Sequence, residues 1–599
     1  MRKWFAFSLL LLFVLPVFFH LGCTKSFTGR VWLLGIDGAD WRIIDPLIES
    51  GRAPAFAKLK QQGAWGELQS IDPMLSPIIW TSIVTGKTPE KHGITWFMVR
   101  NKKTGRMIPV TSNLRQCQAL WNILSTRDVS VAVTGWWASW PAESVNGWVA
   151  TDHLAYHGFG VSGVMNETRE GLTYPASMLD ELTPMLVDPF DIPKSEVEKL
   201  FPLSDAEFAT AAKATFDFSN PLHHTLFALA SFQRYQSIAH HLDNKNATFN
   251  AVYFEFIDTL SHLYMKYRPP QLPGLDDALF NRYRETIDRV YLQQDRLLGQ
   301  WLDQMGEDDI LIVVSDHGFK IGDNRPIEVD ATKIELAHLW HAPHGVIAAY
   351  GRDIRPGHQI DDASVLDITP TILYLLDQPV ADDFDGKVLT ELFTDAFRRN
   401  RQPQSIASYE SGSRRTQAPH PSAIDPQIEA RLKSLGYLGN VGSEQIGLNR
   451  AKSHHRKGNS ELALQLLEEI HDDSPLKIDA LLMASDIARD INQLSHSYQY
   501  LKQALVSARQ RKVTKHQIAQ IYLRLGDNYH REKRTQQALN AFAKAIDNDP
   551  SLYLAHFGQA VVYHSLGKVT EAKKSLNVCL SIKPDYAPAL YLRNQLGVD

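Results

Sequence analysis

The feature that most constrains the fold is an alternation, along residues 30–395, of short apolar runs with helix-like stretches. The runs are rich in β-branched residues and lie at 30–36, 130–135, 250–257, 309–315 and 345–351. A run that is apolar throughout suits a strand buried on both faces, whereas a half-exposed strand alternates apolar with polar residues. The pattern therefore predicts an α/β fold with a mostly parallel sheet flanked by helices.

Beyond about residue 445 the pattern becomes wholly helical and repeats itself. Three residue pairs are 34 positions apart in one register: Tyr529 and Tyr563, Ala538 and Ala572, and Pro550 and Pro584. This period resembles the tetratricopeptide repeat, an all-α solenoid of helical hairpins, over about residues 446–584, with 585–599 as a capping helix. The concave surface of such a solenoid implies a protein partner, and the alternatives are bracing of the preceding domain or homodimerisation.

The N-terminus carries a targeting pattern. Arg2 and Lys3 precede an apolar stretch, 4–19, that is short for a membrane span. The Leu-Gly-Cys that ends at Cys23 resembles the lipobox of bacterial lipoproteins, although His20 stands where that family prefers leucine. An uncleaved signal anchor is the alternative. Both interpretations predict an extracytoplasmic chain tethered to a membrane, and the first predicts a periplasmic lipoprotein.

Composition limits the kinds of site that the chain can form. After Cys23 the only cysteines are Cys117 and Cys579, which fall in different predicted domains, so we expect two buried thiols and no disulfide framework. A metal site must then use histidines and carboxylates. The formal net charge of −5 gives no electrostatic reason to expect nucleic-acid binding.

Three of the predicted strands deliver an acidic residue at or just after their ends. These residues are Asp37, Asp258 and Asp316, the last followed by His317. Ligands bind at the carboxyl ends of strands in open α/β sheets, so the three side chains can converge. His262 would share a helix face with Asp258, and the turn "HLWHAPHG" at 338–345 supplies further imidazoles.

This combination of ligand types predicts a metal centre. A single aspartate at a strand end more often caps a helix or a turn, so the prediction depends on convergence. Mixed carboxylate and imidazole ligation suits Zn²⁺, with Mn²⁺ as the substitute ion. Three carboxylates and three imidazoles exceed the four ligands of one tetrahedral zinc ion, which argues for two ions.

Five segments occur in an order that resembles a known family: "GIDG", "SPIIWTSIVTGKTPEKHGI", "DTLSH", "SDHG" and "HAPHGV". They are similar to the type I phosphodiesterase/nucleotide pyrophosphatase branch of the alkaline phosphatase superfamily, and "VLDITPTILYLL" at 365–376 resembles that superfamily's closing segment. The resemblance implies an alkaline-phosphatase-like sheet and two zinc ions around a hydroxyl nucleophile. By motif position, the ligands would be Asp37, Asp316, His317 and the nucleophile for one ion, and Asp258, His262 and His341 (or His344) for the other.

Ser76 occupies the position of the nucleophilic threonine of the nucleotide pyrophosphatases. Followed by Pro77, it is typical of a helix N-cap, where the helix dipole favours negative charge. A zinc ion at its oxygen would favour the alkoxide without a histidine base. Thr81 and Ser82 are assigned to packing. The resemblance implies in-line displacement through a phosphoseryl intermediate, and a structural cap is the alternative role of Ser76.

The chain also departs from its relatives. Phe97 stands where the nucleotide pyrophosphatases have a phosphate-binding asparagine, and Lys87, Lys91 or a residue of the 155–221 insertion is the candidate replacement. The sulfatase signature is absent, which argues against a sulfatase. The tryptophan cluster in 135–147 is either a stacking platform for a base or sugar, or core packing.

Together the patterns predict four segments: a signal segment at 1–23, a phosphodiesterase domain at 30–395 with a helical insertion at 155–221 that would cap the site, a linker at 396–445 and the repeat domain at 446–599. The expected function is hydrolysis of phosphate esters, with diesters preferred. One alternative is a phosphomonoesterase or phosphotransferase acting on envelope lipids or glycans. The other is a repeat scaffold with a vestigial hydrolase domain.

Overall fold

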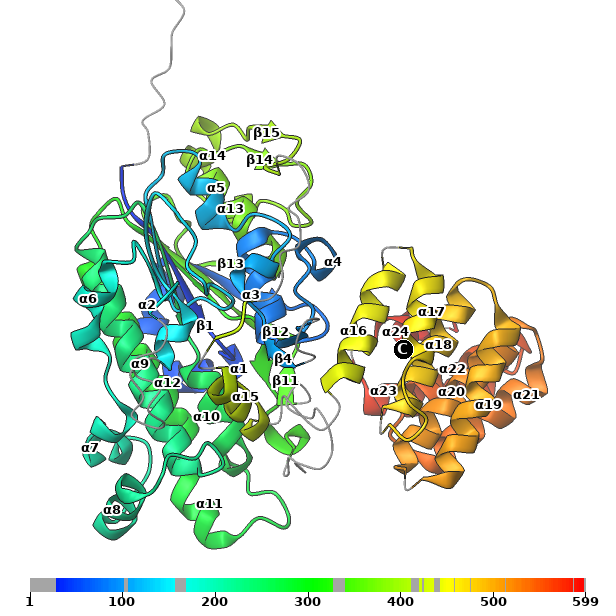
Figure 1. Ribbon diagram of the computed structural model, residues 1–599. Helices are drawn as coiled ribbons and strands as arrows, with labels where there is room; N and C mark the ends of the chain where they lie inside the picture. The colour runs from blue at the N-terminus through cyan, green and yellow to red at the C-terminus, as the bar shows by residue number, and fades with distance from the viewer. Residues whose placement is uncertain are drawn as a thin grey trace, which may run out of the picture.

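The computed structural model describes most of the chain. The described residues are 28–101, 106–156, 169–326, 340–410, 420–422, 425–435, 442–456, 458–474, 476–511, 513–584 and 586–596. The predicted signal segment, including Cys23, lies outside these ranges. Within them, none of the helices combines the length and the apolar character needed to span a membrane. They form an α/β domain followed by a helical domain (Figure 1).

One nine-stranded sheet organises the α/β domain. In spatial order its strands are β13 (His358–Ser364), β2 (Ala64–Gln69), β12 (His344–Gly351), β9 (Ile310–Val314), β1 (Val31–Ile36), β8 (Phe249–Phe254), β5 (Val131–Thr134), β6 (Gly147–Ala150) and β7 (Thr173–Tyr174). The strands β12 and β7 run against the others, and the remaining strands share one direction. The predicted, mostly parallel sheet is confirmed.

Helices cover both faces of this sheet, because alternate residues of the apolar strands point to opposite sides. Trp32 and Leu34 of β1 join one core, under α1 (Trp41–Glu49), α2 (Pro54–Gln62), α9 (Pro221–Asp243), α10 (Phe256–Tyr264) and α12 (Thr286–Gln304). Val31 and Leu33 join the other core, under α3 (Ser76–Thr85), α5 (Leu120–Ser125) and α13 (Ile368–Leu375). The central strands are therefore buried on both faces, as their composition predicts.

The insertion at 155–221 is described in part, and its helices lie beside α9. They are α6 (Met178–Leu182), α7 (Lys194–Glu198) and α8 (Asp205–Lys213). The buried guanidinium of Arg234 on α9 donates hydrogen bonds to the carbonyls of Leu154, Ala155 and Val187, which fastens the start and the middle of this region to α9. The helices α6, α7 and α8 therefore lie along the side of the α/β domain (Figure 1).

The segment predicted as a linker, 396–445, packs in part against the α/β domain. The strand β15 (Ser405–Ile406) pairs with β14 (Val380–Ala381), next to α14 (Asp395–Asn400). Further along, α15 (Asp425–Ser434) buries Ile428 and Leu432 in the core that contains α10. This helix contacts the first turn of α10 through Arg431.

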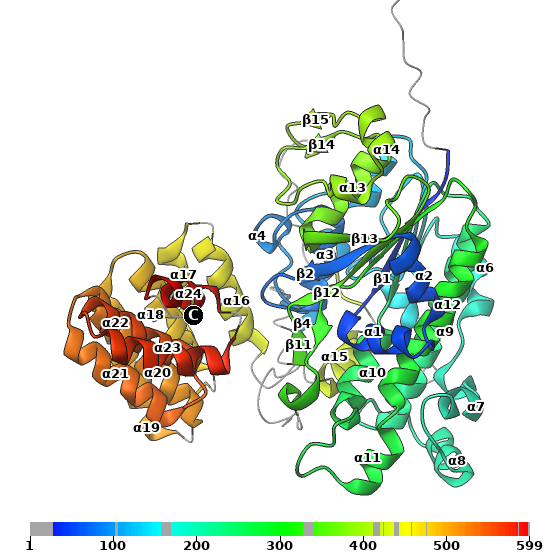
Figure 2. The same ribbon diagram turned by 180° about the vertical axis from the view of Figure 1, so that it is seen from behind.

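The C-terminal domain is a stack of helices. They are α16 (Gly442–Arg456), α17 (Ser460–Glu468), α18 (Lys477–Asp490), α19 (Leu494–Gln510), α20 (Lys515–Arg531), α21 (Thr535–Asn548), α22 (Tyr553–Ser565), α23 (Val569–Ile582) and α24 (Ala587–Gln595). Figure 2 shows this domain on the side of α4 (Pro89–His92) and β2, away from α6 and α9. Cys117 and Cys579 are buried in different domains, and neither forms a disulfide with a described residue.

Candidate metal centre

Two adjacent central strands place acidic residues at one edge of the sheet. Asp37 directly follows β1, and the pair Asp316 and His317 follows the neighbouring parallel strand β9 after one serine. The third strand, β8, ends at Phe254, earlier than predicted, because Glu255 leaves the extended conformation (φ −91°, ψ 2°) and starts α10. Asp258 is therefore in the first turn of a helix and not at the end of a strand.

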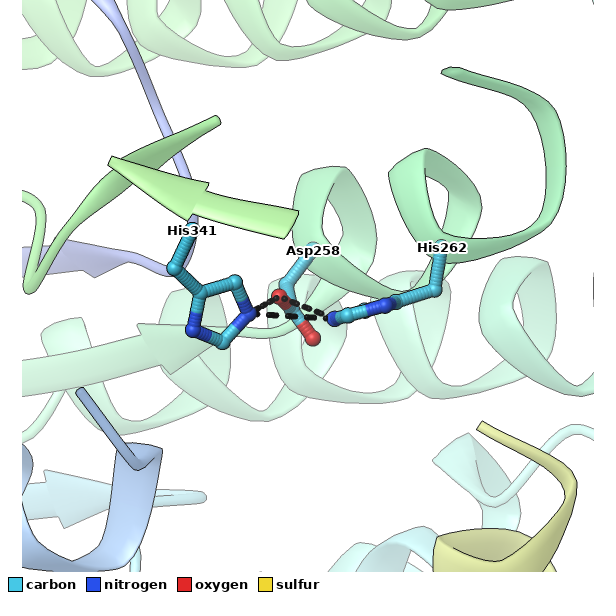
Figure 3. Close-up of side chains that lie close together, drawn as sticks. All are labelled: Asp258, His262 and His341. Atoms are coloured by element: carbon cyan, nitrogen blue, oxygen red, sulfur yellow. Dashed lines mark hydrogen bonds and ion pairs between the residues drawn. The ribbon is translucent and has the colours of Figure 1, made fainter. Parts of the chain in front are cut away.

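Asp258, His262 and His341 form the first group (Figure 3). Asp258 and His262 are one turn apart on α10, as their spacing predicts, and His341 comes from β11 (His341–Ala342). The Oδ1 atom of Asp258 is 3.3 Å from His262 Nε2 and 3.6 Å from His341 Nε2, and the two Nε2 atoms are 3.1 Å apart. His344, the alternative to His341, is half-exposed and lies 3.7 Å from Glu67 instead.

Asp37, Asp258 and His317 form a second group that shares Asp258 with the first. His317 Nε2 is 3.4 Å from Asp37 Oδ1 and 4.0 Å from Asp258 Oδ1. Asp316 adds a fourth side chain, with its Oδ2 3.5 Å from the same nitrogen. The structure thus brings six of the predicted ligands into one continuous, buried cluster.

Backbone carbonyls orient two of the imidazoles. His317 Nδ1 donates to the carbonyl of Gly318 at 3.1 Å, and His341 Nδ1 donates to that of Met74 at 2.9 Å. Because a carbonyl only accepts, the proton is on Nδ1 and the Nε2 lone pair faces the carboxylates. Burial lowers the pKa of both histidines, so the rings are neutral, as metal ligands must be.

The carboxylates are crowded in a way that a cation would relieve. Burial and the charge of Asp258 raise the pKa of Asp37 to about 8, and burial and Asp37 raise that of Asp316 well above its usual value. Burial also opposes the charge of Asp258, but His262 and His341 outweigh it and hold its pKa low. Asp37 Oδ1, Asp316 Oδ2 and His317 Nε2 are buried without a hydrogen bond to any described residue. Such a set of inward-facing donors fits divalent cations.

The other oxygen of Asp37 is held in place by two aromatic donors. Trp80 Nε1 donates to Asp37 Oδ2 at 2.9 Å, and the hydroxyl of Tyr253 donates to the same atom at 2.6 Å. These bonds leave Oδ1 directed at His317, an arrangement typical of outer partners that orient a metal ligand.

Ser76 is the first residue of α3, one position later than the predicted N-cap. Leu75 is the N-cap, since its backbone is extended and its carbonyl accepts from Ile78 and Ile79. Ser76 is a buried residue, and its hydroxyl makes no hydrogen bond to the residues that the structure describes. Two residues before it, Met74 holds His341, and one turn after it, Trp80 holds Asp37. Ser76 thus lies between the anchors of the two groups, and its role as a nucleophile stays a prediction.

Two of the proposed replacements for the missing asparagine, Lys87 and Lys91, form ion pairs elsewhere, whereas a replacement from the 155–221 insertion stays a prediction. Lys87 forms an ion pair with Asp383 at 2.7 Å, and Lys91 forms one with Asp385 at 2.6 Å. Phe97 is buried against Trp96 and Trp137.

The tryptophan cluster belongs to the packing of the domain. Trp136 is buried edge-on against Trp80, and Trp140 is buried with its ring stacked on His153. Trp137, which is half-buried, donates to the hydroxyl of Tyr253. These contacts favour core packing over a stacking platform.

Comparisons with known proteins match the α/β domain and the C-terminal helical domain separately. Residues 31–368 match the family described as type I phosphodiesterase / nucleotide pyrophosphatase, and residues 519–552 and 554–586 match the tetratricopeptide repeat. The Hsp70-Hsp90 organising protein of Plasmodium falciparum is 36% identical over 75 residues, which are 12% of this chain and 29% of that protein. The chain therefore spans less than a third of this curated relative.

Two solved structures are similar to parts of the chain. The APC/C hetero-tetramer Cut9-Hcn1 is 19% identical with a TM-score of 0.24, covering 29% of this chain and 33% of that one. The MamA structure is 21% identical with a TM-score of 0.21, covering 25% of this chain and 85% of that one.

Proposed function

Because the chain belongs to the type I phosphodiesterase/nucleotide pyrophosphatase family, we propose that it is a two-metal hydrolase of phosphate esters, with diesters as preferred substrates. The observation that carries the proposal is the buried cluster in which two groups of ligand atoms share Asp258. A vestigial domain would have no reason to keep three aspartates and three imidazoles facing one another without compensating charge.

The donor set supports zinc, with Mn²⁺ as the substitute. His262, His341 and Asp258 would hold one ion, and Asp37, Asp316 and His317 the other. When bound, such ions supply Lewis-acid stabilisation of the attacking and leaving oxygens in an in-line displacement.

The residues of this chain then have distinct tasks. Ser76, at the start of α3, is the attacking group: its oxygen bonds to phosphorus as the bond to the leaving alcohol breaks, and water afterwards hydrolyses the phosphoserine. Trp80 and Tyr253 fix the orientation of Asp37, and the carbonyls of Met74 and Gly318 keep the proton of each bonded imidazole on Nδ1.

Substitution of Ser76 by alanine tests the proposal. The protein would be stripped with EDTA, reloaded with zinc and assayed on an aryl phosphate diester, a monoester and a sulfate. We expect diester turnover in the zinc form, and a loss of at least about 1,000-fold in Ser76→Ala because the covalent route is removed.

The matched control is Thr81→Ala, which removes a hydroxyl from the same helix. Thr81 donates only to the carbonyl of Pro77, so the variant should keep near-normal turnover. Equal activity of Ser76→Ala and wild type would show that Ser76 is not the nucleophile. If the zinc-loaded protein hydrolysed none of these esters, the proposed hydrolase function would be wrong.

Two further proposals concern the setting of the enzyme. The repeat match at 519–586 supports a role for the C-terminal domain in binding a protein partner. The charged and apolar N-terminal pattern and Cys23 support an extracytoplasmic, membrane-tethered lipoprotein. Mass spectrometry of the mature N-terminus tests the second proposal, because a lipidated Cys23 and an intact signal anchor differ in mass.

A further inference from the structure

The helix α15 lies beyond the family match, yet it completes the surroundings of the metal centre. Its apolar face joins the α/β core through Ile428 and Leu432, and Arg431 on the same helix is 4% exposed. An arginine buried this deeply requires partners that compensate its charge.

Arg431 finds those partners on both sides of Asp258. Its guanidinium forms an ion pair with Glu255 at 2.7 Å and donates to the hydroxyl of Thr259 at 2.9 Å. Glu255 precedes Asp258 by three residues and Thr259 follows it directly, so Arg431 spans the first turn of α10. It also donates to the hydroxyl of Tyr156 at 2.9 Å.

The same contacts lead to the second group of ligands. Arg431, Glu255 and Tyr253 line a cavity of about 30 Å³, room for one or two water molecules. Tyr253 lines this cavity and donates to Asp37. The buried guanidinium of Arg431 therefore contacts α10, which carries Asp258. It also lines the same cavity as Tyr253, which orients Asp37.

We propose that Arg431 is a positioning residue for the metal centre, supplied by a segment outside the family domain. By joining Glu255, Thr259 and Tyr156, its planar fork fixes the angle at which α10 presents Asp258 and His262. Residues that orient ligands in this way typically change metal affinity 10- to 100-fold when they are replaced. The inference rests on the proposed metal site.

The test measures zinc affinity and stoichiometry by competition with a chromophoric chelator, using the full chain. In Arg431→Lys the charge remains but one ammonium cannot reach all three partners, so we expect one of the two zinc ions to bind about 10-fold or more weakly. Thr259→Val, which is nearly isosteric, removes one hydrogen bond and should weaken the same ion several-fold. It also keeps the test valid if Arg431→Lys fails to fold.

The control is Lys433→Ala on the same helix, whose exposed side chain pairs with Glu429 and should leave zinc binding unchanged. A lower melting temperature of the zinc-free Arg431→Lys and Thr259→Val proteins with unchanged zinc affinity would show a merely structural role and overturn the inference. If the wild-type chain bound no zinc, the proposed function itself would be wrong, so the two failures are distinguishable.

Discussion

At the scale of the residue, Asp37 makes the metal-free protein sensitive to pH. Its pKa is raised to about 8 by burial and by Asp258, whereas an unfolded aspartate titrates near 4. Between these values the folded state keeps a proton on Asp37 that the unfolded state has lost, so the contribution of Asp37 to stability falls as the pH rises from about 4 to about 8. We expect the melting temperature of EDTA-treated protein to fall across this range, and zinc to restore it most at the alkaline end.

Replacing the carboxylate isolates this effect. Asp37→Asn should flatten the pH dependence of the melting temperature, raise the stability of the metal-free protein at pH 8 and reduce stabilisation by zinc. Asp303→Asn, at an exposed position near the end of α12, is the matched control and should behave like wild type. Identical pH profiles of Asp37→Asn and wild type would show that Asp37 is not the group that titrates.

The indole of Trp80 is expected to act on the metal centre rather than on the fold alone. Trp80→Phe keeps the edge-on packing against Trp136 and Tyr253 but removes the hydrogen bond to Asp37. Zinc affinity, measured by chelator competition, should fall about 10-fold. Trp96→Phe is the control, because the buried Trp96 Nε1 bonds to none of the described residues; equal losses in both variants would contradict a specific role for Trp80.

Individual ligands were predictable where their signal is local. Asp37, Asp316 and His317 stand next to apolar strands, and His262 is one helical turn from Asp258, so short patterns indicate them. Arg431 gave no such signal, because its partners lie more than 150 residues away and its own segment is polar and rich in proline. Only the packing of α15 brings it to the site.

At the scale of the element, the strand ends were the least predictable. The run 250–257 contains only two strongly polar residues, Asn250 and Glu255, so the sequence alone does not separate the end of β8 from the start of α10. The chain changes from strand to helix at the backbone of Glu255. Arg431 compensates the buried negative charge of the Glu255 side chain. The solenoid, by contrast, was visible from its period alone, since identical contacts recur with each repeat.

Phe542 sets the spacing of the last repeats. A Cβ atom added at Gly526 on α20 or at Gly558 on α22 would lie 2.5 Å from its ring. We therefore expect Gly526→Ala to destabilise the protein by about 1–3 kcal/mol, because the added Cβ would overlap the packed ring of Phe542 and force the ring or the helix to move. Denaturant unfolding measures the effect.

The control in the same domain is Gly447→Ala on α16. The nearest atom to its added Cβ would be the carbonyl oxygen of Leu466 at 3.8 Å, so alanine should be neutral or stabilising by up to about 1 kcal/mol. If both substitutions had the same effect, Phe542 would not control the approach of the helices.

At the scale of the whole molecule, the two domains meet at α16, where polar side chains bridge them. On α16, Lys452 is 3.0 Å from Asp72, Arg456 donates to the carbonyl of Asp72, and Asn449 donates to that of Thr95. Exposed ion pairs contribute only about 0.2–1 kcal/mol each and weaken in salt. We expect Lys452→Glu with Arg456→Glu to increase the radius of gyration in small-angle scattering, and salt to do the same to wild type.

The reversal Asp72→Lys in that double variant should restore part of the compact form, which a general loss of folding would not allow. A radius of gyration insensitive to salt and to both changes would mean that the ion pairs do not hold the domains together.

The place of β12 in the sheet has a consequence for the order in which the chain is completed. This strand lies between β2 and β9 and, among the strands that the structure describes, is the only one that joins β2 and β13 to the rest of the sheet. A nascent chain that has not yet exposed residues 344–351 must therefore carry β2 unpaired and β9 as an open edge, the kind of edge that recruits other strands. His341 is synthesised just before this strand, so the group formed by Asp258, His262 and His341 becomes complete at the same stage as the sheet.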